Sequence, residues 1–323
     1  MRDGGGKGEV PAGFGNIVTM ASADHRIYFI AQHGISSGLM ADQIDPDRQN
    51  PNIPQLVQRE ELPYGATTPF IQRTFGAAAE LMDPTHLPEG FPKDRGLLIA
   101  LAAAKDLAAV ADTVADLRAR EAEVRVRMDR GEIKLTHLPS TPNLQGRGEQ
   151  TIGHLRAVQV GLFELAGLFY PKARANAPWI ESVRKGFAPE DDFNHYLDGA
   201  VGALAEIANC RNALIHPDAQ KSVTITDYDL RADGALVAPT IEVRHPETPV
   251  SRRDIVQFFD VQIGIVADIF ETFLGVFCDR NVRDFGYGIF ETRVVPVSDG
   301  GLRNASRLHW QSWPKEGITF PQG

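Results

Sequence analysis

The chain has 323 residues, and its 33 Lys and Arg against 42 Asp and Glu give a formal net charge of −9. A net-acidic chain does not attract nucleic acid through its overall field, so any contact with RNA or DNA must come from a local basic site. Two cysteines are too few for a disulfide framework, and the apolar runs are interrupted by charges. The sequence therefore predicts a cytoplasmic globular protein without a membrane segment or a signal peptide.

Residues 1–66 are expected to form an irregular N-terminal arm. Glycine and proline are frequent there, and only the run from Arg26 to Ala31 has the apolar character of a strand. We expect such an arm to wrap around the core or a partner.

The pattern changes after this segment, and residues 67–280 are predicted to form a helical domain. Thr68 followed by Pro69 is a typical helix start, with an N-cap hydroxyl and a proline in the first turn. Apolar residues at helical spacing, ended by proline or glycine, predict further helices. The expected helices cover residues 68–83, 93–130, 149–170, 178–187, 189–216 and 251–277.

Before the last of these helices the apolar residues alternate with polar ones. This alternation predicts a β-hairpin insert at about 221–245, with a tight turn at Asp233 and Gly234. The last helix is apolar over a broader face than one core requires, which suggests a dimer seam. Residues 281–323 are expected to form an extended C-terminal tail. The predicted fold is mainly α: a helical bundle with one β-hairpin insert and irregular extensions at both ends.

The residues with the clearest chemical meaning are at the end of the helix predicted over 189–216. On a helical wheel, Arg211 lies in the middle of the apolar stripe, where an arginine is costly unless it meets anions or a second subunit. His216 follows at the helix end, and Pro217 disfavours helical geometry at that histidine. Structural roles also fit: Arg211 could cap its helix or pair with a buried carboxylate, and His216 could be a C-cap.

The sequence Arg211-Asn212-x-x-x-His216 near the end of the penultimate helix resembles the signature of the HEPN superfamily, in which Arg, four to six residues and His form the active site. The resemblance covers the helical domain from about Thr68 to Asp279. It implies a homodimeric, metal-independent endoribonuclease without a cofactor, of the antiviral-defence or toxin–antitoxin type, with an antitoxin or regulatory protein as a possible partner. One branch of the superfamily carries His-x-Tyr, and here the residues are His216-Pro217-Asp218, so the nucleotidyltransferase partner of that branch is not expected.

Cleavage of RNA without a metal needs a base for the 2′-OH, an acid for the leaving 5′-oxygen, and a cation for the phosphorane. An imidazole titrates near neutral pH, so His216 suits the first two tasks, one in each copy of a dimer. The guanidinium of Arg211 suits the phosphate oxygens, and Asn212 would orient the phosphate or the imidazole. The expected products carry 2′,3′-cyclic phosphate and 5′-OH ends.

Four further cations flank the motif helix and are candidates for binding the RNA backbone: Lys172, Arg174, Arg184 and Lys185. Asp191, Asp192 and His195 have a spacing that can bind a metal, but it is more typical of an acidic first helical turn, and no metal is predicted. The alternative to a nuclease is a non-catalytic HEPN-like module that binds RNA or nucleotide or serves in assembly.

Overall fold

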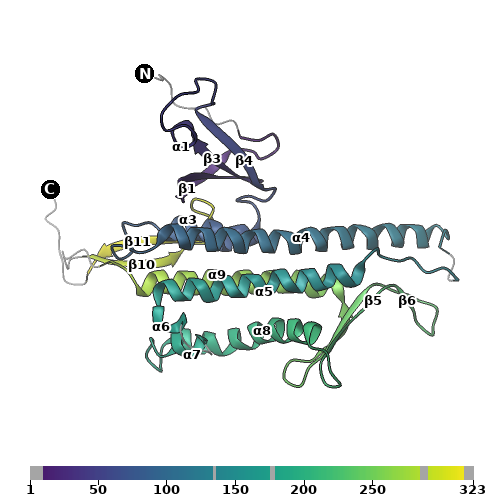
Figure 1. The fold of residues 1–323 in the computed structure, drawn as a ribbon. Coiled ribbons are helices and arrows are strands. Elements are labelled where there is room, and N and C mark those ends of the chain that lie inside the picture. Colours follow the sequence, from purple (N-terminus) through teal and green to yellow (C-terminus); the bar gives the residue numbers. More distant parts are fainter. Residues whose placement is uncertain (1–9, 134–135, 175–178, 284–289, 316–323) are drawn as a thin grey trace. The chain divides into compact units, whose positions relative to one another are not determined.

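The computed structural model describes residues 10–133, 136–174, 179–283 and 290–315 (Figure 1). Helices make up 48% of the structure and strands 21%. The prediction of a mainly α bundle with irregular extensions is therefore wrong, and the fold is mixed α/β. The error lies in the segments before and after the predicted helical domain, because both contain antiparallel strands.

The long helices are close to those predicted from the sequence. Proline and glycine near their ends explain the agreement, because α5 stops just before Pro171 and α4 ends shortly before Gly131, which has a φ of +69°. The first predicted helix is divided at Thr74 into two short ones. The helices are α1 (Ala41–Ile44), α2 (Pro69–Arg73), α3 (Phe75–Leu81), α4 (Lys93–Asp129), α5 (Leu144–Phe169), α6 (Pro171–Arg174), α7 (Trp179–Arg184), α8 (Asp192–Ile215) and α9 (Ile255–Arg280).

The N-terminal segment is a four-stranded antiparallel sheet, with strands in the order β1-β2-β3-β4. Its strands are β1 (Ile17–Ala23), β2 (Arg26–Ala31), β3 (Ile35–Met40) and β4 (Leu56–Leu62). Only β2 was predicted. The central strand β3 buries Ser36 and Ser37 beside Ile35, so it lacks the apolar alternation that marks a half-buried strand.

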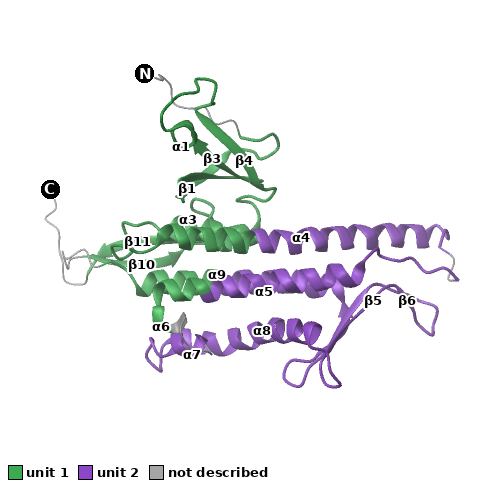
Figure 2. Cartoon of the chain, in the orientation of Figure 1, with its two compact units in different colours: residues 1–104, 164–175, 270–323 green, residues 105–163, 176–269 purple. Residues whose placement is uncertain are grey.

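The chain divides into two compact units (Figure 2). Unit 1 consists of Met1–Ala104, Glu164–Ala175 and Phe270–Gly323, and unit 2 consists of Lys105–Phe163 and Asn176–Ile269. Helices α4, α5 and α9 each contribute residues to both units.

Unit 1 contains the N-terminal sheet and a C-terminal hairpin. The hairpin pairs β10 (Phe290–Pro296) with β11 (Leu308–Pro314), so the predicted extended tail is ordered into a sheet. The indole of Trp310 donates a hydrogen bond to the carbonyl oxygen of Leu81 at the end of α3 (3.0 Å). A Cβ added at Gly76 on α3 would collide with the carbonyl oxygen of Ala305, because the turn before β11 lies directly against this helix.

Unit 2 contains the predicted β-hairpin. Strand β5 (Ser222–Thr226) pairs with β8 (Thr240–Arg244), which confirms the pairing, and β9 (Val250–Asp254) adds a third strand. Short strands β6 (Asp229–Leu230) and β7 (Leu236–Val237) close the hairpin around the predicted turn, where Gly234 has a φ of +82°. Strand β5 begins just after α8 and packs against it, so the hairpin adjoins the motif helix (Figure 1).

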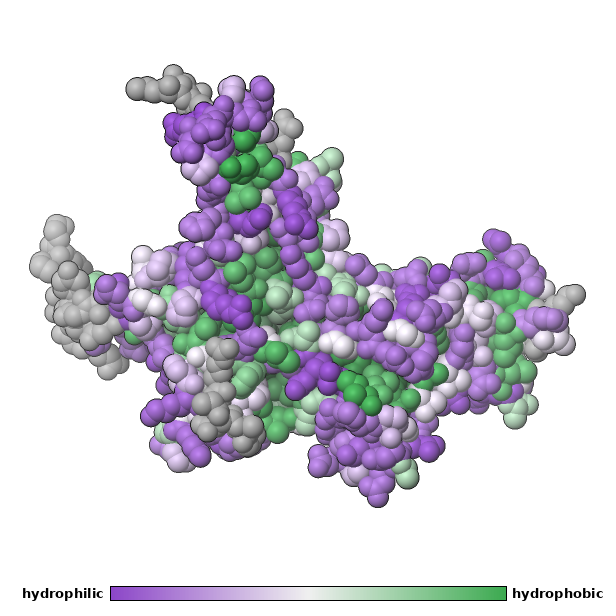
Figure 3. All heavy atoms as spheres, in the orientation of Figure 1, coloured by the Kyte–Doolittle hydropathy of each residue, from purple (hydrophilic) through white to green (hydrophobic). Residues whose placement is uncertain are grey.

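The apolar face of α9 is covered within the chain. Ile255, Phe259, Phe270 and Phe273 are each fully buried, which explains the breadth of the face without a dimer seam. Among the described residues, α9 is the one helix long and apolar enough to cross a membrane, but 61% of its most apolar stretch is buried in the protein, and a core helix passes the same criterion. On the face drawn in Figure 3 the surface is mostly hydrophilic, with hydrophobic patches between.

Candidate active site at the end of α8

Helix α8 places the motif residues at its C-terminal end. The helix begins at an N-cap, Asp191, whose side chain accepts a hydrogen bond from the amide of Phe193 (3.0 Å). It ends at His216, which has φ −127° and ψ 62° and donates its amide to the carbonyl oxygen of Asn212 (2.9 Å). His216 is therefore a C-cap, as the structural alternative proposed, and its imidazole remains exposed for chemistry.

Arg211 is exposed, so the expectation that it lies in a buried stripe is wrong. The stripe is covered as far as Ile207. In the last two turns the buried positions are instead Cys210 and Ala213, and Ile215 is 47% exposed. Strands β5 and β8 pack against α8 and cover a different side of its end from the side that the earlier turns bury. The motif side of the last turns is left open.

A second arginine that the sequence analysis missed lies beside Arg211. Arg156, on α5, is partly buried, and its Nη1 donates to Oε1 of Gln159 one turn away (2.7 Å). Gln159 is buried, and its Nε2 donates to the carbonyl oxygen of Leu204 on α8 (2.9 Å). Burial, and then the nearby charge of Arg211, lower the pKa of the Arg156 guanidinium from its usual value. The charge of Arg211 is thus near enough to affect Arg156, and the bond from Gln159 to Leu204 joins the two helices that carry these arginines.

No carboxylate neutralises this pair among the described residues. Within the described chain, the side chain of Arg156 makes only the bond to Gln159, and the side chain of Arg211 makes no hydrogen bond or ion pair. The nearest acid on the same helix, Glu206, accepts a hydrogen bond from Nε2 of Gln262 on α9 (2.6 Å). Two adjacent unpaired cations repel each other and favour an anion between them.

The cysteine beside the motif is poorly suited to act as a nucleophile. Cys210 is 1% exposed, and burial, followed by the charge of Glu206, raises its thiol pKa to about 12. A thiol with so high a pKa carries almost no thiolate at neutral pH. The chemistry available at this end of α8 is therefore that of Arg156, Arg211, Asn212 and His216.

Arg184 and Lys185, two of the other predicted cations, lie far from the motif. Arg184, on α7, pairs with Asp198 on α8 (2.8 Å) and with Glu181 (3.5 Å), so its charge is already compensated. Asp198 lies eighteen residues before His216, on the order of 27 Å along the helix. Lys185 follows Arg184 and is exposed at the same end of α8.

Lys172 and Arg174 belong to the other compact unit, on α6. Lys172 is exposed, and the side chain of Arg174 lies outside the described part of the structure. Their contribution to RNA binding therefore stays a prediction.

An open hollow of about 550 Å³ is lined by Gln220, which follows the motif in the chain, and by residues of the segment 242–251 that include Arg244, His245 and Ser251. The loop after β8 that forms part of its wall is fastened to α8, because Nδ2 of Asn209 donates to Oγ1 of Thr248 (3.2 Å). This loop is thus joined to the motif helix, although the residues that line the hollow come from the segments after α8.

No family model, curated protein or solved structure matches this chain. In the described part of the chain, no group of three or more His, Cys, Asp or Glu side chains is placed to hold a metal ion.

Proposed function

We propose that this protein is an endoribonuclease of the HEPN type that cleaves RNA at the end of α8. The observation that supports this function best is the pair of guanidinium groups of Arg156 and Arg211, which no described carboxylate neutralises. Two neighbouring arginines bind a phosphodiester well, because it is an anion. The same arginines would stabilise the additional negative charge that the phosphate gains in the transition state. The exposed imidazole of His216 on the same helix end supplies the proton transfer.

The proposed step uses only the groups of the chain and the RNA. The 2′-oxygen attacks the adjacent phosphorus while one His216 removes its proton, and the bond from phosphorus to the 5′-oxygen breaks while a second His216 protonates that oxygen. The products are a 2′,3′-cyclic phosphate and a 5′-OH. Arg156 and Arg211 hold the non-bridging oxygens, and Asn212 orients the phosphate or an imidazole.

A second copy of the chain would supply the second imidazole. Gln159 bonds to Leu204 and Arg156 lies by Arg211, so α5 and α8 run antiparallel here. Val160 follows Arg156 by one turn on α5, and Ile215 follows Arg211 by one turn on α8; the two side chains are 43% and 47% exposed. Because the helices run in opposite directions, these two apolar residues lie on opposite sides of the arginine pair. Protein interfaces bury apolar side chains and are enriched in arginine relative to the rest of the surface. We infer a homodimer with the two motifs facing each other.

The test is cleavage of a mixed RNA pool in the presence of EDTA, with the product ends identified chemically. We expect cyclic phosphate and 5′-OH ends from the wild-type protein, and no cleavage of 2′-O-methyl RNA or of DNA. The variants His216→Ala and Arg156→Gln should each lose at least 10²-fold in rate. His195→Ala changes another exposed histidine of α8, far from the motif, and should cleave like the wild type.

Intact RNA from a folded wild-type protein, or equal activity in His216→Ala, would contradict the proposal. If the wild-type protein binds RNA without cleaving it, and Arg156→Gln no longer binds that RNA, the non-catalytic module would be favoured instead. Two free, buried cysteines fit the reducing cytoplasm in which we propose that the enzyme works.

The proposed role is antiviral defence or toxicity held in check by an antitoxin, and it rests on the resemblance of the motif. Expression of the wild-type chain alone should then arrest cell growth, and the same level of His216→Ala should not. Equal growth with both proteins would remove the support for a toxin.

A further inference from the structure

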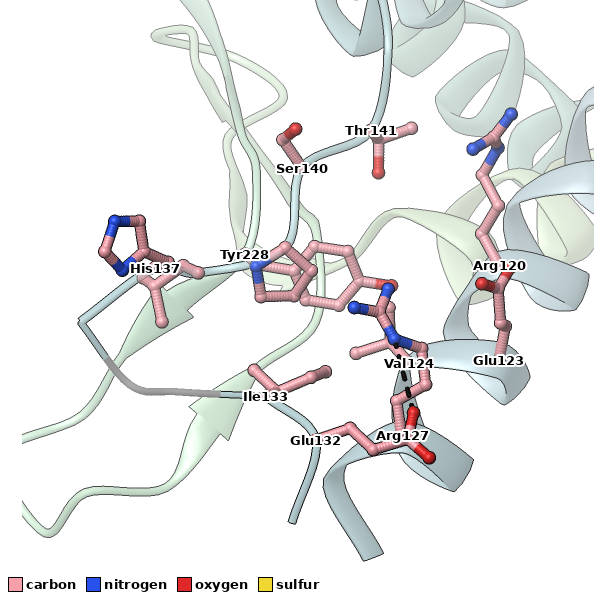
Figure 4. Close-up of a pocket in the computed structure, with 12 residues that line it drawn as sticks. Arg120, Glu123, Val124, Arg127, Glu132, Ile133, His137, Ser140, Thr141 and Tyr228 are labelled. Carbon is pink, nitrogen blue, oxygen red and sulfur yellow. Dashed lines mark ion pairs between the residues drawn. The ribbon is translucent and has the colours of Figure 1, made fainter. Parts of the chain in front are cut away.

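A second hollow in unit 2 is formed by the C-terminal half of α4, the segment 136–141 and Tyr228 (Figure 4). Its volume is about 500 Å³, within the usual range for small-molecule sites. None of its lining residues belongs to the motif at the end of α8. The proposed cleavage at His216 therefore does not account for this hollow.

The hydroxyl of Tyr228 lacks a partner in this hollow. The side chain is 9% exposed, yet its hydroxyl makes no hydrogen bond with any described residue, and in Figure 4 it points toward the α4 side chains. Burial, and then the charge of nearby Glu121, raise the pKa of the phenol to about 12, so it remains a hydrogen-bond donor. A buried hydroxyl without a partner costs free energy, which a ligand that supplies one would recover.

Two arginines of α4 line the same hollow and have donors to spare. Arg120 uses Nε for Asp116 (3.1 Å), and its terminal nitrogens make no other hydrogen bond in the described structure. Arg127 has only a long ion pair, with its Nε 4.0 Å from Oε2 of Glu132. The two residues are seven apart, two turns along one face of the helix, and both line the hollow.

The remaining walls carry apolar, hydroxyl and ionisable side chains, and the ionisable ones are Glu123, Glu132 and His137. Val124, Ile133, Leu138 and Pro139 provide apolar surface, and Ser140 adds a hydroxyl. Thr141 is fixed at the rim because its amide donates to a carboxylate oxygen of Asp227, next to Tyr228 (2.7 Å). A flat heterocycle fits against such apolar surface, while the sugar and phosphate meet the hydroxyl groups and the arginines.

We propose that this hollow binds a nucleoside monophosphate group, with the base against the apolar wall, the phosphate at Arg120 and Arg127, and a polar edge on the hydroxyl of Tyr228. The group could belong to a free nucleotide or to one nucleotide of an RNA chain, since both present the same base, ribose and phosphate. The inference does not depend on cleavage at His216.

The test is calorimetric titration of the full chain with AMP, GMP, CMP and UMP, with the four nucleosides and inorganic phosphate as separate arms. We expect at least one nucleotide to bind with a submillimolar Kd, and its nucleoside and phosphate to bind at least tenfold more weakly. Tyr228→Phe should weaken nucleotide binding about tenfold without lowering the Tm, because the deleted hydroxyl has no partner in the free protein. Arg127→Gln should weaken it at least tenfold.

Arg130→Gln is the matched control. Arg130 is on the same helix and lies 3.8 Å from the same Glu132, but it does not line the hollow. The variant makes the same change of charge and should bind nucleotide like the wild type.

A non-cleavable 2′-O-methyl oligoribonucleotide distinguishes the two sources of the ligand. If the hollow serves RNA, the oligomer displaces the mononucleotide and binds more weakly to Arg127→Gln; if it serves a free nucleotide, the oligomer does neither. The proposal is overturned if no nucleotide binds up to 5 mM, if phosphate alone binds as tightly, or if Arg130→Gln weakens binding as much as Arg127→Gln.

Discussion

The arginine of the motif differs from an ordinary helix-end cation in having an unpaired cation as its neighbour. Arg211→Ala removes the repulsion with Arg156, so we expect the Tm to stay level or to rise. Cleavage should fall by roughly 10²–10³, the usual loss for one donor to transition-state charge. Arg211→Lys should restore little, because an ammonium does not offer the planar fork of a guanidinium. Thermal unfolding and single-turnover cleavage measure the two effects separately.

The opposite pattern would identify a structural arginine. A Tm that falls by many degrees in Arg211→Ala, with activity that follows the folded fraction, would mean that an anionic partner of Arg211 had been stranded.

We also expect the stability of the folded protein to depend on pH through one residue, Glu121. Burial, and then the charge of Asp254, raise the pKa of Glu121 from 4.5 to about 7, so the folded state binds this proton more tightly than the unfolded state. The stabilisation from Glu121 is fully present below pH 4.5 and is lost as the pH rises through 7. Glu121→Gln should therefore match the wild type near pH 4.5 and be more stable by about 1–2 kcal/mol at pH 8, a value reduced for partial exposure.

Urea unfolding at both pH values measures this difference. Glu123→Gln, an exposed glutamate on the same helix, is the control and should show no such change with pH. A constant difference between Glu121→Gln and the wild type across this range would contradict the raised pKa.

Among the elements, the helices could be predicted because residues close to each helix end determine where the helix begins or stops. Asp191 caps α8 at one end, and Pro217 follows its last residues at the other. The N-terminal strands could not be predicted in this way. Strand β1 exposes Ile17, Val18 and Met20, and β3 buries two serines. The apolar residues of these strands therefore do not alternate with polar ones, because pairing with neighbouring strands decides which side chains are covered.

The same limit applies to the candidate site. The sequence singled out Arg211, Asn212 and His216 because they lie on one helix end, but the helical wheel gave Arg211 the wrong burial. A wheel assumes that one side of a helix is covered along its whole length, whereas the hairpin strands cover the end of α8 from another side. Arg156 was missed because its only link to the motif is through space, from a different helix.

The contact between α3 and the turn before β11 can be tested by the stability of a variant at Gly76. Gly76→Ala would press a methyl group onto the backbone of Ala305, which cannot yield like a flexible side chain. We expect a loss of about 1–3 kcal/mol of stability. Gly153→Ala is the control: it is an exposed glycine of α5 with open space around it and should gain about 0.5–1 kcal/mol from helix propensity.

Chemical denaturation of both variants measures these changes. Gly76→Ala as stable as the wild type would show that the turn does not lie against α3 in solution.

For the whole molecule, the proposed composite site requires two copies of the chain. Val160→Asp and Ile215→Asp each place a charge in the apolar surface beside the two arginines and should convert a dimer to a monomer and abolish cleavage together. Val126→Asp changes a similarly exposed valine, 46% accessible, on α4 and should leave both properties intact. Light scattering at micromolar concentration and cleavage assays provide the measurements. An active monomer would remove the need for a second imidazole.

The order of synthesis sets a constraint on how unit 1 is completed. The hydrogen bond between Leu81 and Trp310 joins groups that are 229 residues apart, and ribosomes add about 5–20 residues per second. Helix α3 therefore emerges roughly 10–50 s before the strand that covers it. During that interval Phe75, Leu81 and Met82, all fully buried in the finished protein, have no cover from the C-terminal hairpin. We expect the nascent chain to associate with chaperones that recognise exposed apolar segments, and to release them only after Trp310 has left the exit tunnel.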